Sequence, residues 1–131
     1  MKKSYMIFIF LGVLIFSCTK DEIKIDPNNP LIGIWNYSSQ ETNTLVFTRS
    51  QEFSDNYCYR FNVDGTLIER NISGWCATPP VSYTNYQGNW AMQNDTLINV
   101  NVTYYDGKRN YKLVIEEVNA YSLKLIYKSG N

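Results

Sequence analysis

The chain has 131 residues, 44% of them hydrophobic, and its 12 basic and 12 acidic side chains cancel to a formal charge of zero. This length suits a single domain, and the lack of a basic excess or cluster argues against a nucleic-acid partner. The sequence contains no histidine, so the commonest general base and a frequent metal ligand are both missing.

The first 17 residues have the pattern of an export signal. Lys2 and Lys3 precede an uncharged, largely apolar run over residues 5–16, which is too short for a bilayer span of roughly 20 residues. A basic start, a short apolar core and a small residue before the cut are typical of a secretory signal peptide. Ile15-Phe16-Ser17-Cys18 resembles the bacterial lipobox, which implies that residues 1–17 are removed and that Cys18 carries the acyl anchor, such as palmitate. A plain signal peptide with an incidental cysteine is the alternative.

Residues 18–30 are interpreted as the acylated cysteine and a flexible linker. Pro27 and Pro30 disfavour helix and central strand in this stretch. The order Cys18, Lys20, Asp21, Glu22 resembles the signal that sends Bacteroidetes lipoproteins to the surface of the outer membrane. The resemblance implies surface display, and a solvated tether is the alternative. Cleavage before Cys18 deletes two basic residues and no acidic ones, which leaves a net charge near −2.

From residue 31 onward the hydrophobic pattern repeats every two residues, and no helical stripe is present. Asp64-Gly65 predicts a two-residue hairpin turn of the primed type, and Asn94-Asp95 and Asp106-Gly107 mark further turns. We predict strands over 32–38, 44–48, 57–62, 86–92, 97–104, 111–115 and 121–128, and a returning strand that continues through Leu67 and Ile68. An open sheet of this kind would have two edge strands with unpaired backbone groups, and closure into a barrel pairs them. The predicted fold of residues 31–131 is therefore all-β, an up-and-down antiparallel β-barrel of about eight strands. A curled open sheet or a two-sheet sandwich is the alternative.

Gly33 and Trp35 are predicted to organise one end of this barrel. Gly33 has no Cβ, so another segment can lie against its backbone, and Trp35 can plug the barrel end with its indole N–H turned toward a carbonyl. This Gly-x-Trp resembles the N-terminal motif of lipocalins. Followed in order by residues 61–66, 86–90 and 94–97, it makes residues 31–128 resemble the lipocalin-like domain of Bacteroidetes lipoproteins. The resemblance implies a β-barrel and offers no catalytic residues.

Two cysteines remain once Cys18 is assigned to the anchor. Cys58 and Cys76 lie in a compartment where disulfides persist, and a bridge would close a loop of about 18 residues and stabilise the fold by roughly 3 kcal/mol. Two buried free thiols are the alternative. The turn-rich segment 71–85 between them carries Trp75 and Tyr83, which we expect either to form a lid or aromatic platform or, for Trp75, to pack over the disulfide.

No residue set has the pattern of a reaction centre. Glu116 and Glu117 point to opposite faces of a strand, and no phosphate loop, calcium loop or metal-ligand spacing is present. We therefore expect no catalysis, no cofactor and no metal. The leading hypothesis is a surface lipoprotein whose barrel binds a small apolar or amphipathic ligand. The alternative is a solid-cored module that binds a glycan or a partner protein through Trp75, Tyr83 and other rim residues. The candidate lining residues of the barrel are Trp35, Tyr59, Phe61, Trp90, Val100, Val102 and Leu113.

Overall fold

The computed structural model describes residues 25–74 and 79–130, so the export signal and Cys18 lie outside the described part. It contains eight strands, namely β1 (Gly33–Glu41), β2 (Thr44–Ser50), β3 (Cys58–Phe61), β4 (Thr66–Ile72), β5 (Tyr83–Met92), β6 (Leu97–Tyr104), β7 (Gly107–Val118) and β8 (Ser122–Ser129). No helix among the described residues is long and apolar enough to cross a membrane.

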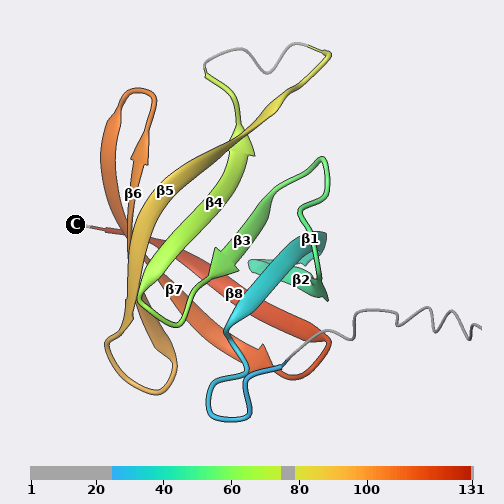
Figure 1. Cartoon of the computed structure of the whole chain (residues 1–131), viewed down its shortest axis with the longest axis vertical. Coiled ribbons are helices and arrows are strands. Elements are labelled where there is room, and N and C mark those ends of the chain that lie inside the picture. Colours follow the sequence, from blue (N-terminus) through green and yellow to red (C-terminus); the bar gives the residue numbers. More distant parts are fainter. Residues whose placement is uncertain (1–24, 75–78, 131) are drawn as a thin grey trace, which may run out of the picture.

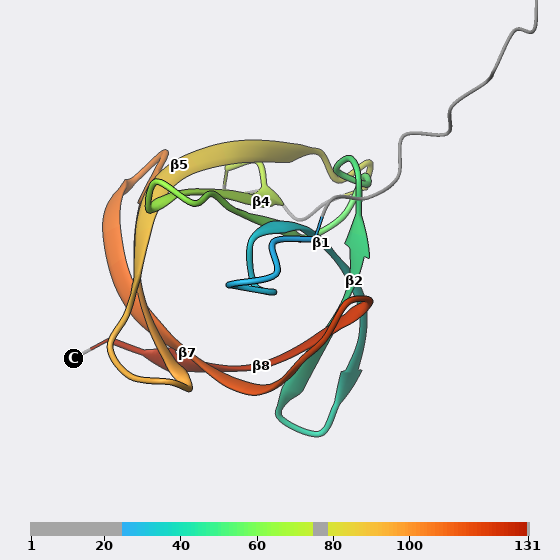
Figure 2. The ribbon, with the colours of Figure 1, turned by 60° about the horizontal axis from the view of Figure 1, so that its bottom comes forward.

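The eight strands form a closed antiparallel barrel, as the alternation and the turn signals predicted (Figures 1 and 2). Around the barrel the order is β1, β2, β8, β7, β6, β5, β4, β3. Strands β3 to β8 follow one another as neighbours, whereas the first hairpin is inserted in the reverse sense. β1 pairs with β3, and β2 closes the barrel against β8, with Leu45 opposite Leu125.

The chain reaches β3 by crossing over the outside of β1. Residues 51–57 form this crossing, and Asn36 of β1 fastens it: its side-chain amide donates to the Glu52 carbonyl (3.1 Å) and its side-chain oxygen accepts from the Ser54 N–H (3.3 Å). The Tyr37 N–H also donates to the Tyr57 carbonyl (2.9 Å). Since β1 thus has partners on both sides near its start, neither edge is left open there.

Two local expectations were wrong. The turn at Asp64-Gly65 is not of the primed type, because Gly65 has a φ of +85° while Thr42 is the only described non-glycine residue with positive φ. The Gly65 N–H donates to the Asn62 carbonyl (3.1 Å), and Asp64 Oδ1 accepts from the Thr66 N–H (2.9 Å), which is a three-residue connection with a bulge. The long loop is also shorter than predicted: β4 continues to Ile72 and β5 begins at Tyr83, so the connection is 73–82.

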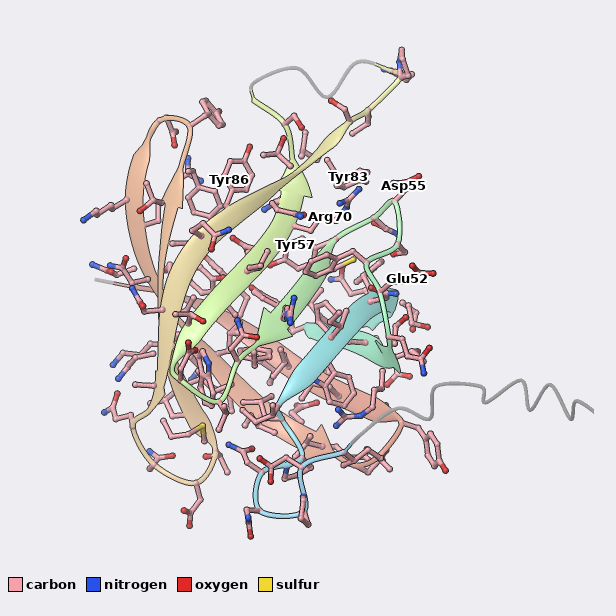
Figure 3. The ribbon with its side chains drawn as sticks, in the orientation of Figure 1. Glu52, Asp55, Tyr57, Arg70, Tyr83 and Tyr86 are labelled. Atoms are coloured by element: carbon pink, nitrogen blue, oxygen red, sulfur yellow. The ribbon has the colours of Figure 1, made fainter. Side chains whose placement is uncertain are left out.

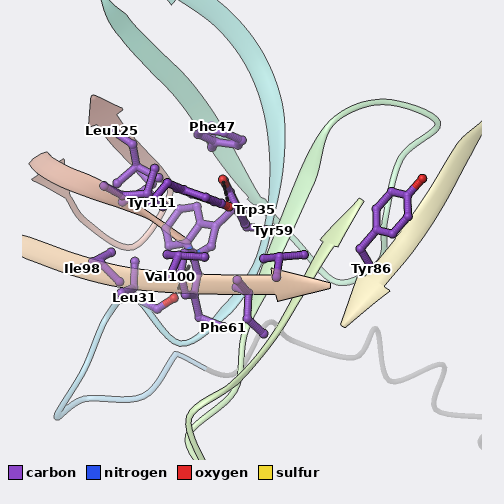
Figure 4. Close-up of a cluster of buried hydrophobic side chains, with 14 residues drawn as sticks. Leu31, Trp35, Phe47, Tyr59, Phe61, Tyr86, Ile98, Val100, Tyr111 and Leu125 are labelled. Carbon is purple, nitrogen blue, oxygen red and sulfur yellow. Dashed lines mark hydrogen bonds between the residues drawn. The ribbon is translucent and has the colours of Figure 1, made fainter. Parts of the chain in front are cut away.

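Large side chains from all around the barrel fill its interior. Trp35, Tyr59, Phe47 and Phe61 are the largest fully buried ones (Figure 4). The Tyr59 ring lies 5.6 Å from Phe47 and 5.4 Å from Phe61, measured between ring centroids. Aliphatic residues complete the core, including Leu67, Ile98, Val100, Val102, Leu113, Leu123 and Leu125.

The segment before β1 closes one barrel end, called here the closed end, and in Figure 2 it crosses the ring of strands. The Trp35 indole N–H donates to the Leu31 carbonyl (2.8 Å), as predicted from Gly33 and Trp35. Arg49 stacks over the Trp35 ring at 4.2 Å and donates to the carbonyls of Ala120 (2.7 Å), Ile32 (2.8 Å) and Pro30. A Cβ on Gly33 would lie only 2.6 Å from an Arg49 nitrogen, so the glycine makes room for the guanidinium.

Candidate functional site

The other end of the barrel, called here the mouth, carries a ring of tyrosines. It is the end where β1 and β2 turn at 42–43, β4 leads into 73–82, and β6 and β7 turn at 105–106. Four inward-facing tyrosines are partly exposed there, and we call them the mouth tyrosines: Tyr37, Tyr57, Tyr104 and Tyr127. Tyr127 is the most accessible, with 50% of its surface exposed. A tyrosine suits such a position because its ring packs while its hydroxyl meets water or a polar partner.

Below the mouth tyrosines lies a buried carboxylate, Glu69 of β4, which is 2% exposed. Its Oε1 accepts hydrogen bonds from the hydroxyls of Tyr57 (2.7 Å), Tyr59 (3.2 Å) and Tyr111 (3.0 Å). Its Oε2 accepts one from Tyr104. We call these five residues the Glu69 cluster. It supplies the hydrogen bonds that a buried polar group requires.

The Glu69 cluster spans the lumen. β3 and β7 are four strands apart in either direction around the barrel, so they face each other across it. The hydroxyls of Tyr59 on β3 and Tyr111 on β7 nevertheless lie only 2.7 Å apart. Tyr57 joins the same network through its hydroxyl, 2.6 Å from that of Tyr59. Side chains therefore bridge the barrel at this level, between the apolar core and the mouth.

Burial keeps the phenols of the Glu69 cluster protonated. Loss of hydration raises the pKa of Tyr59 and Tyr111 well above 10.0, the usual value. Burial likewise raises the pKa of Tyr57, and the Glu69 charge adds to the effect. The pKa of Tyr104 is raised for the same two reasons, in the same order. All four hydroxyls therefore remain hydrogen-bond donors to the carboxylate at neutral pH.

The outer wall beside the mouth carries a separate polar group (Figure 3). Arg70 of β4 forms an ion pair with Asp55 (3.0 Å) and donates to Asn85 (3.2 Å). Tyr86 of β5 points into the barrel and donates to the Ile72 carbonyl (3.0 Å). Tyr83 begins β5 three residues earlier, so strand alternation puts it on the opposite, outer face. Tyr83 is thus not one of the residues that line the lumen.

The predicted lining residues form the core. Trp35, Tyr59, Phe61, Val100, Val102 and Leu113 are each at most 3% exposed and pack in one cluster. Trp90 is half-buried at the closed end, where its indole N–H donates to the Asn62 carbonyl (2.9 Å) and its ring meets Phe61 edge-on. Only Tyr59 of this set belongs to the Glu69 cluster. Their role as ligand contacts stays a prediction.

The predicted disulfide and lid cannot be followed, because Trp75 and Cys76 lie outside the described residues. Cys58 is fully buried beneath the crossing 51–57 and has no disulfide partner among the described residues. Its sulfur lies 3.2 Å from the Asn56 carbonyl oxygen and 3.4 Å from the Ser54 hydroxyl. The bridge to Cys76 therefore stays a prediction.

Sequence reasoning missed Glu69. Alternation alone places it inside, because Leu67 is two residues earlier on the same strand and is fully buried. A charged residue at an inward position is the signal that was available. Its partners Tyr104 and Tyr111 are 35 and 42 residues away, so the cluster itself was beyond reach of local patterns.

Two further observations concern metal binding and the opposite end of the barrel. Within residues 25–74 and 79–130, no three His, Cys, Asp or Glu side chains gather closely enough to hold a metal ion. A hollow of about 440 Å³ lies at the closed end, between the segment 28–31 and the 92–95 turn, with Ile115 and Val118 in its wall. This hollow is at the opposite end from the Glu69 cluster.

In comparisons with known proteins, no family model, no curated protein and no solved structure matches the chain.

Proposed function

We propose that this chain is a non-catalytic binding module that holds a small amphipathic ligand at the mouth of its barrel. The carrying observation is the contrast between the two halves of the lumen. The half toward the closed end is filled by fully buried rings and aliphatic side chains, whereas the mouth presents four partly exposed tyrosines. Partly exposed aromatic side chains that converge on one entrance are suited to a ligand with one apolar and one polar part.

The filled core supports a contact at the mouth over one deeper in the barrel. The Tyr59 and Tyr111 hydroxyls meet across the lumen at 2.7 Å, so a ligand that passed this level would have to break the Glu69 cluster. Leaving a buried carboxylate without its donors is costly, of the order of 1–3 kcal/mol or more for each lost partner. Contact above the cluster avoids that cost.

We further propose that Cys18 anchors the module in a membrane, as a lipocalin-like lipoprotein exposed on the cell surface. The supporting observation is the position of the segment before β1, which crosses the closed end. The residues between Cys18 and this segment would therefore hold the closed end toward the membrane and leave the mouth accessible. Substitution Cys18→Ala should abolish incorporation of labelled palmitate and release the protein into the soluble fraction.

The binding proposal is tested by extracting the full chain in mild detergent from cells that produce it and identifying co-purifying small molecules by mass spectrometry. We expect Tyr127→Ala, at the mouth, to lose the bound molecule. Tyr121→Ala is the control, because Tyr121 is 78% exposed but lies at the closed end. Met92→Ala tests the hollow at the closed end. Loss with Met92→Ala and retention with Tyr127→Ala would contradict the proposal.

A second candidate is an interaction module that binds a glycan or a partner protein through the same mouth. The filled core favours it, because no small molecule is then needed inside the barrel. In that case the extracted chain carries no small molecule, and Tyr127→Ala abolishes capture of a cell-surface glycan or partner without lowering the melting temperature.

A further inference from the structure

We infer that the mouth selects ligands with a cationic head group, an alkylammonium, and that Glu69 is the residue that receives it. This inference rests on the proposed binding at the mouth and names the class of ligand. Three features of the Glu69 cluster support it: a charge with no basic partner, an oxygen with fewer hydrogen-bond donors and aromatic surroundings.

The first feature is the charge. Glu69 is 2% exposed, yet no lysine or arginine among the described residues lies within ion-pair distance of it. Arg70 forms its ion pair with Asp55. Arg109 stacks on the Tyr104 ring but forms its ion pair with Asp106 and not with Glu69. Four phenols hydrogen-bond the carboxylate but bring no positive charge. Buried charges are normally paired, so a cation from outside would complete this site.

The second feature is the distribution of donors over the two carboxylate oxygens. Oε1 accepts from three hydroxyls, whereas Oε2 accepts from Tyr104 alone among the described residues. The four donors are therefore shared unevenly, and Oε2 is the carboxylate oxygen with fewer partners. Tyr104 is one of the mouth tyrosines, so the donor to Oε2 among the described residues comes from the mouth.

The third feature is the set of rings around this oxygen. The Tyr104 ring lies 5.1 Å from Tyr86, and the Tyr111 ring lies 4.9 Å from Tyr127, between centroids. The Arg109 guanidinium already stacks 5.0 Å above the Tyr104 ring, so this ring accepts a cation on its face. An ammonium donating to Oε2 would have tyrosine faces beside it and could rest its hydrocarbon part on Tyr127. An anionic head group would meet the repulsion of Glu69.

The test uses three probes of one shape and different charge: 2-phenylethylammonium, 2-phenylethanol and 3-phenylpropanoate. Each is titrated into the full chain by calorimetry at neutral pH. We expect the ammonium to bind about tenfold more tightly than the alcohol, with no binding of the carboxylate, because a charged hydrogen bond is at stake. Glu69→Gln keeps the shape and removes the charge, and should weaken ammonium binding about tenfold. Glu52→Gln, an exposed carboxylate outside the cluster, is the matched control and should change nothing.

The outcomes separate this inference from the proposed function. If the alcohol or the carboxylate binds as well as the ammonium, and Tyr127→Ala abolishes that binding, the mouth is a binding site but the cation inference is wrong. If no probe binds, both are contradicted. Should Glu69→Gln fail to fold, Tyr104→Phe decides. It frees Oε2 of its phenol, so ammonium binding should strengthen, and a folded Tyr104→Phe protein that does not bind the ammonium overturns the inference.

Discussion

Replacement of Arg49 by methionine should strongly destabilise the closed end of the barrel. The Arg49 guanidinium donates to the carbonyls of Ala120, Ile32 and Pro30, and it stacks on Trp35 at 4.2 Å. Methionine keeps most of the volume and the apolar contact but removes every donor. Each hydrogen bond to a charged donor contributes about 1.5–3 kcal/mol, and the stack adds about 0.5–2 kcal/mol.

These contributions share one side chain and do not add fully, so we expect Arg49→Met to lower the free energy of unfolding by about 3–4 kcal/mol. For a domain of this size the loss corresponds to a melting temperature lower by roughly 15 °C or more. Urea unfolding followed by tryptophan fluorescence measures it directly. Arg60→Met is the matched control, because Arg60 is exposed on β3. A loss below about 1 kcal/mol would refute the reasoning, since it would mean that water serves the three carbonyls as well as the guanidinium does.

Three further outcomes follow from the same geometry. Gly33→Ala should lower the free energy of unfolding, measured in urea, more than Gly107→Ala does. Both glycines have φ near +130°, but only at Gly33 would the new Cβ meet a neighbour, an Arg49 nitrogen at 2.6 Å. Equal losses would mean that the Arg49 side chain shifts freely. Trp35→Phe should cost about 2–3 kcal/mol through the lost hydrogen bond to Leu31 and the smaller ring, and an unchanged unfolding midpoint would show that the indole N–H contributes nothing. The free energy of unfolding should fall as pH rises above 10, by about 1.4 kcal/mol per pH unit for each phenol that the fold keeps protonated. The pKa of Tyr57, Tyr59 and Tyr111 is raised in the folded state, so the unfolded chain loses those protons first. Phenolate absorbance checks this, and full titration of every tyrosine near pH 10 before unfolding would contradict it.

The two-residue pattern was sufficient for the fold class and for most of the core. It placed Tyr59, Phe61, Val100, Val102 and Leu113 on inward faces, and all five are buried. Those positions are determined locally, because successive side chains of a strand must point to opposite faces. The roles of Gly33 and Trp35 could also be predicted from the sequence, because a missing Cβ allows a close neighbour and an indole N–H requires an acceptor.

The strand order around the barrel was not readable in the same way. The alternation of β1 fixes which of its side chains face inward but not which strands lie beside it. The hydrophobic pattern therefore fits a simple sequential order as well as the observed one. What decides is the path of residues 51–57, which are held on the outside of β1 by Asn36. The Asp64-Gly65 turn failed for a related reason, because its length depends on which residues pair beside it, and Phe61 pairs with Leu67.

The Glu69 cluster was missed because it runs against the pattern that revealed the core. Hydrophobic alternation treats an inward charge as an exception, and nothing near residue 69 in the sequence explains it. The explanation lies in hydroxyls from three other parts of the chain: Tyr57 and Tyr59 beside β4, Tyr104 on β6 and Tyr111 on β7. Only the closed barrel brings them together.

The reversed insertion of the first hairpin has a consequence for how the chain is made. A growing polypeptide can form β1 and β2 early, but the free side of β2 finds its partner only when β8, the last strand, is complete, as in the pairing of Thr44 with Ile126. Until then the edges of β2 and β7 that pair with β8 remain unpaired and can bind other molecules. Loss of the final dozen residues should therefore cause aggregation during biosynthesis, even though it removes none of the mouth tyrosines except Tyr127.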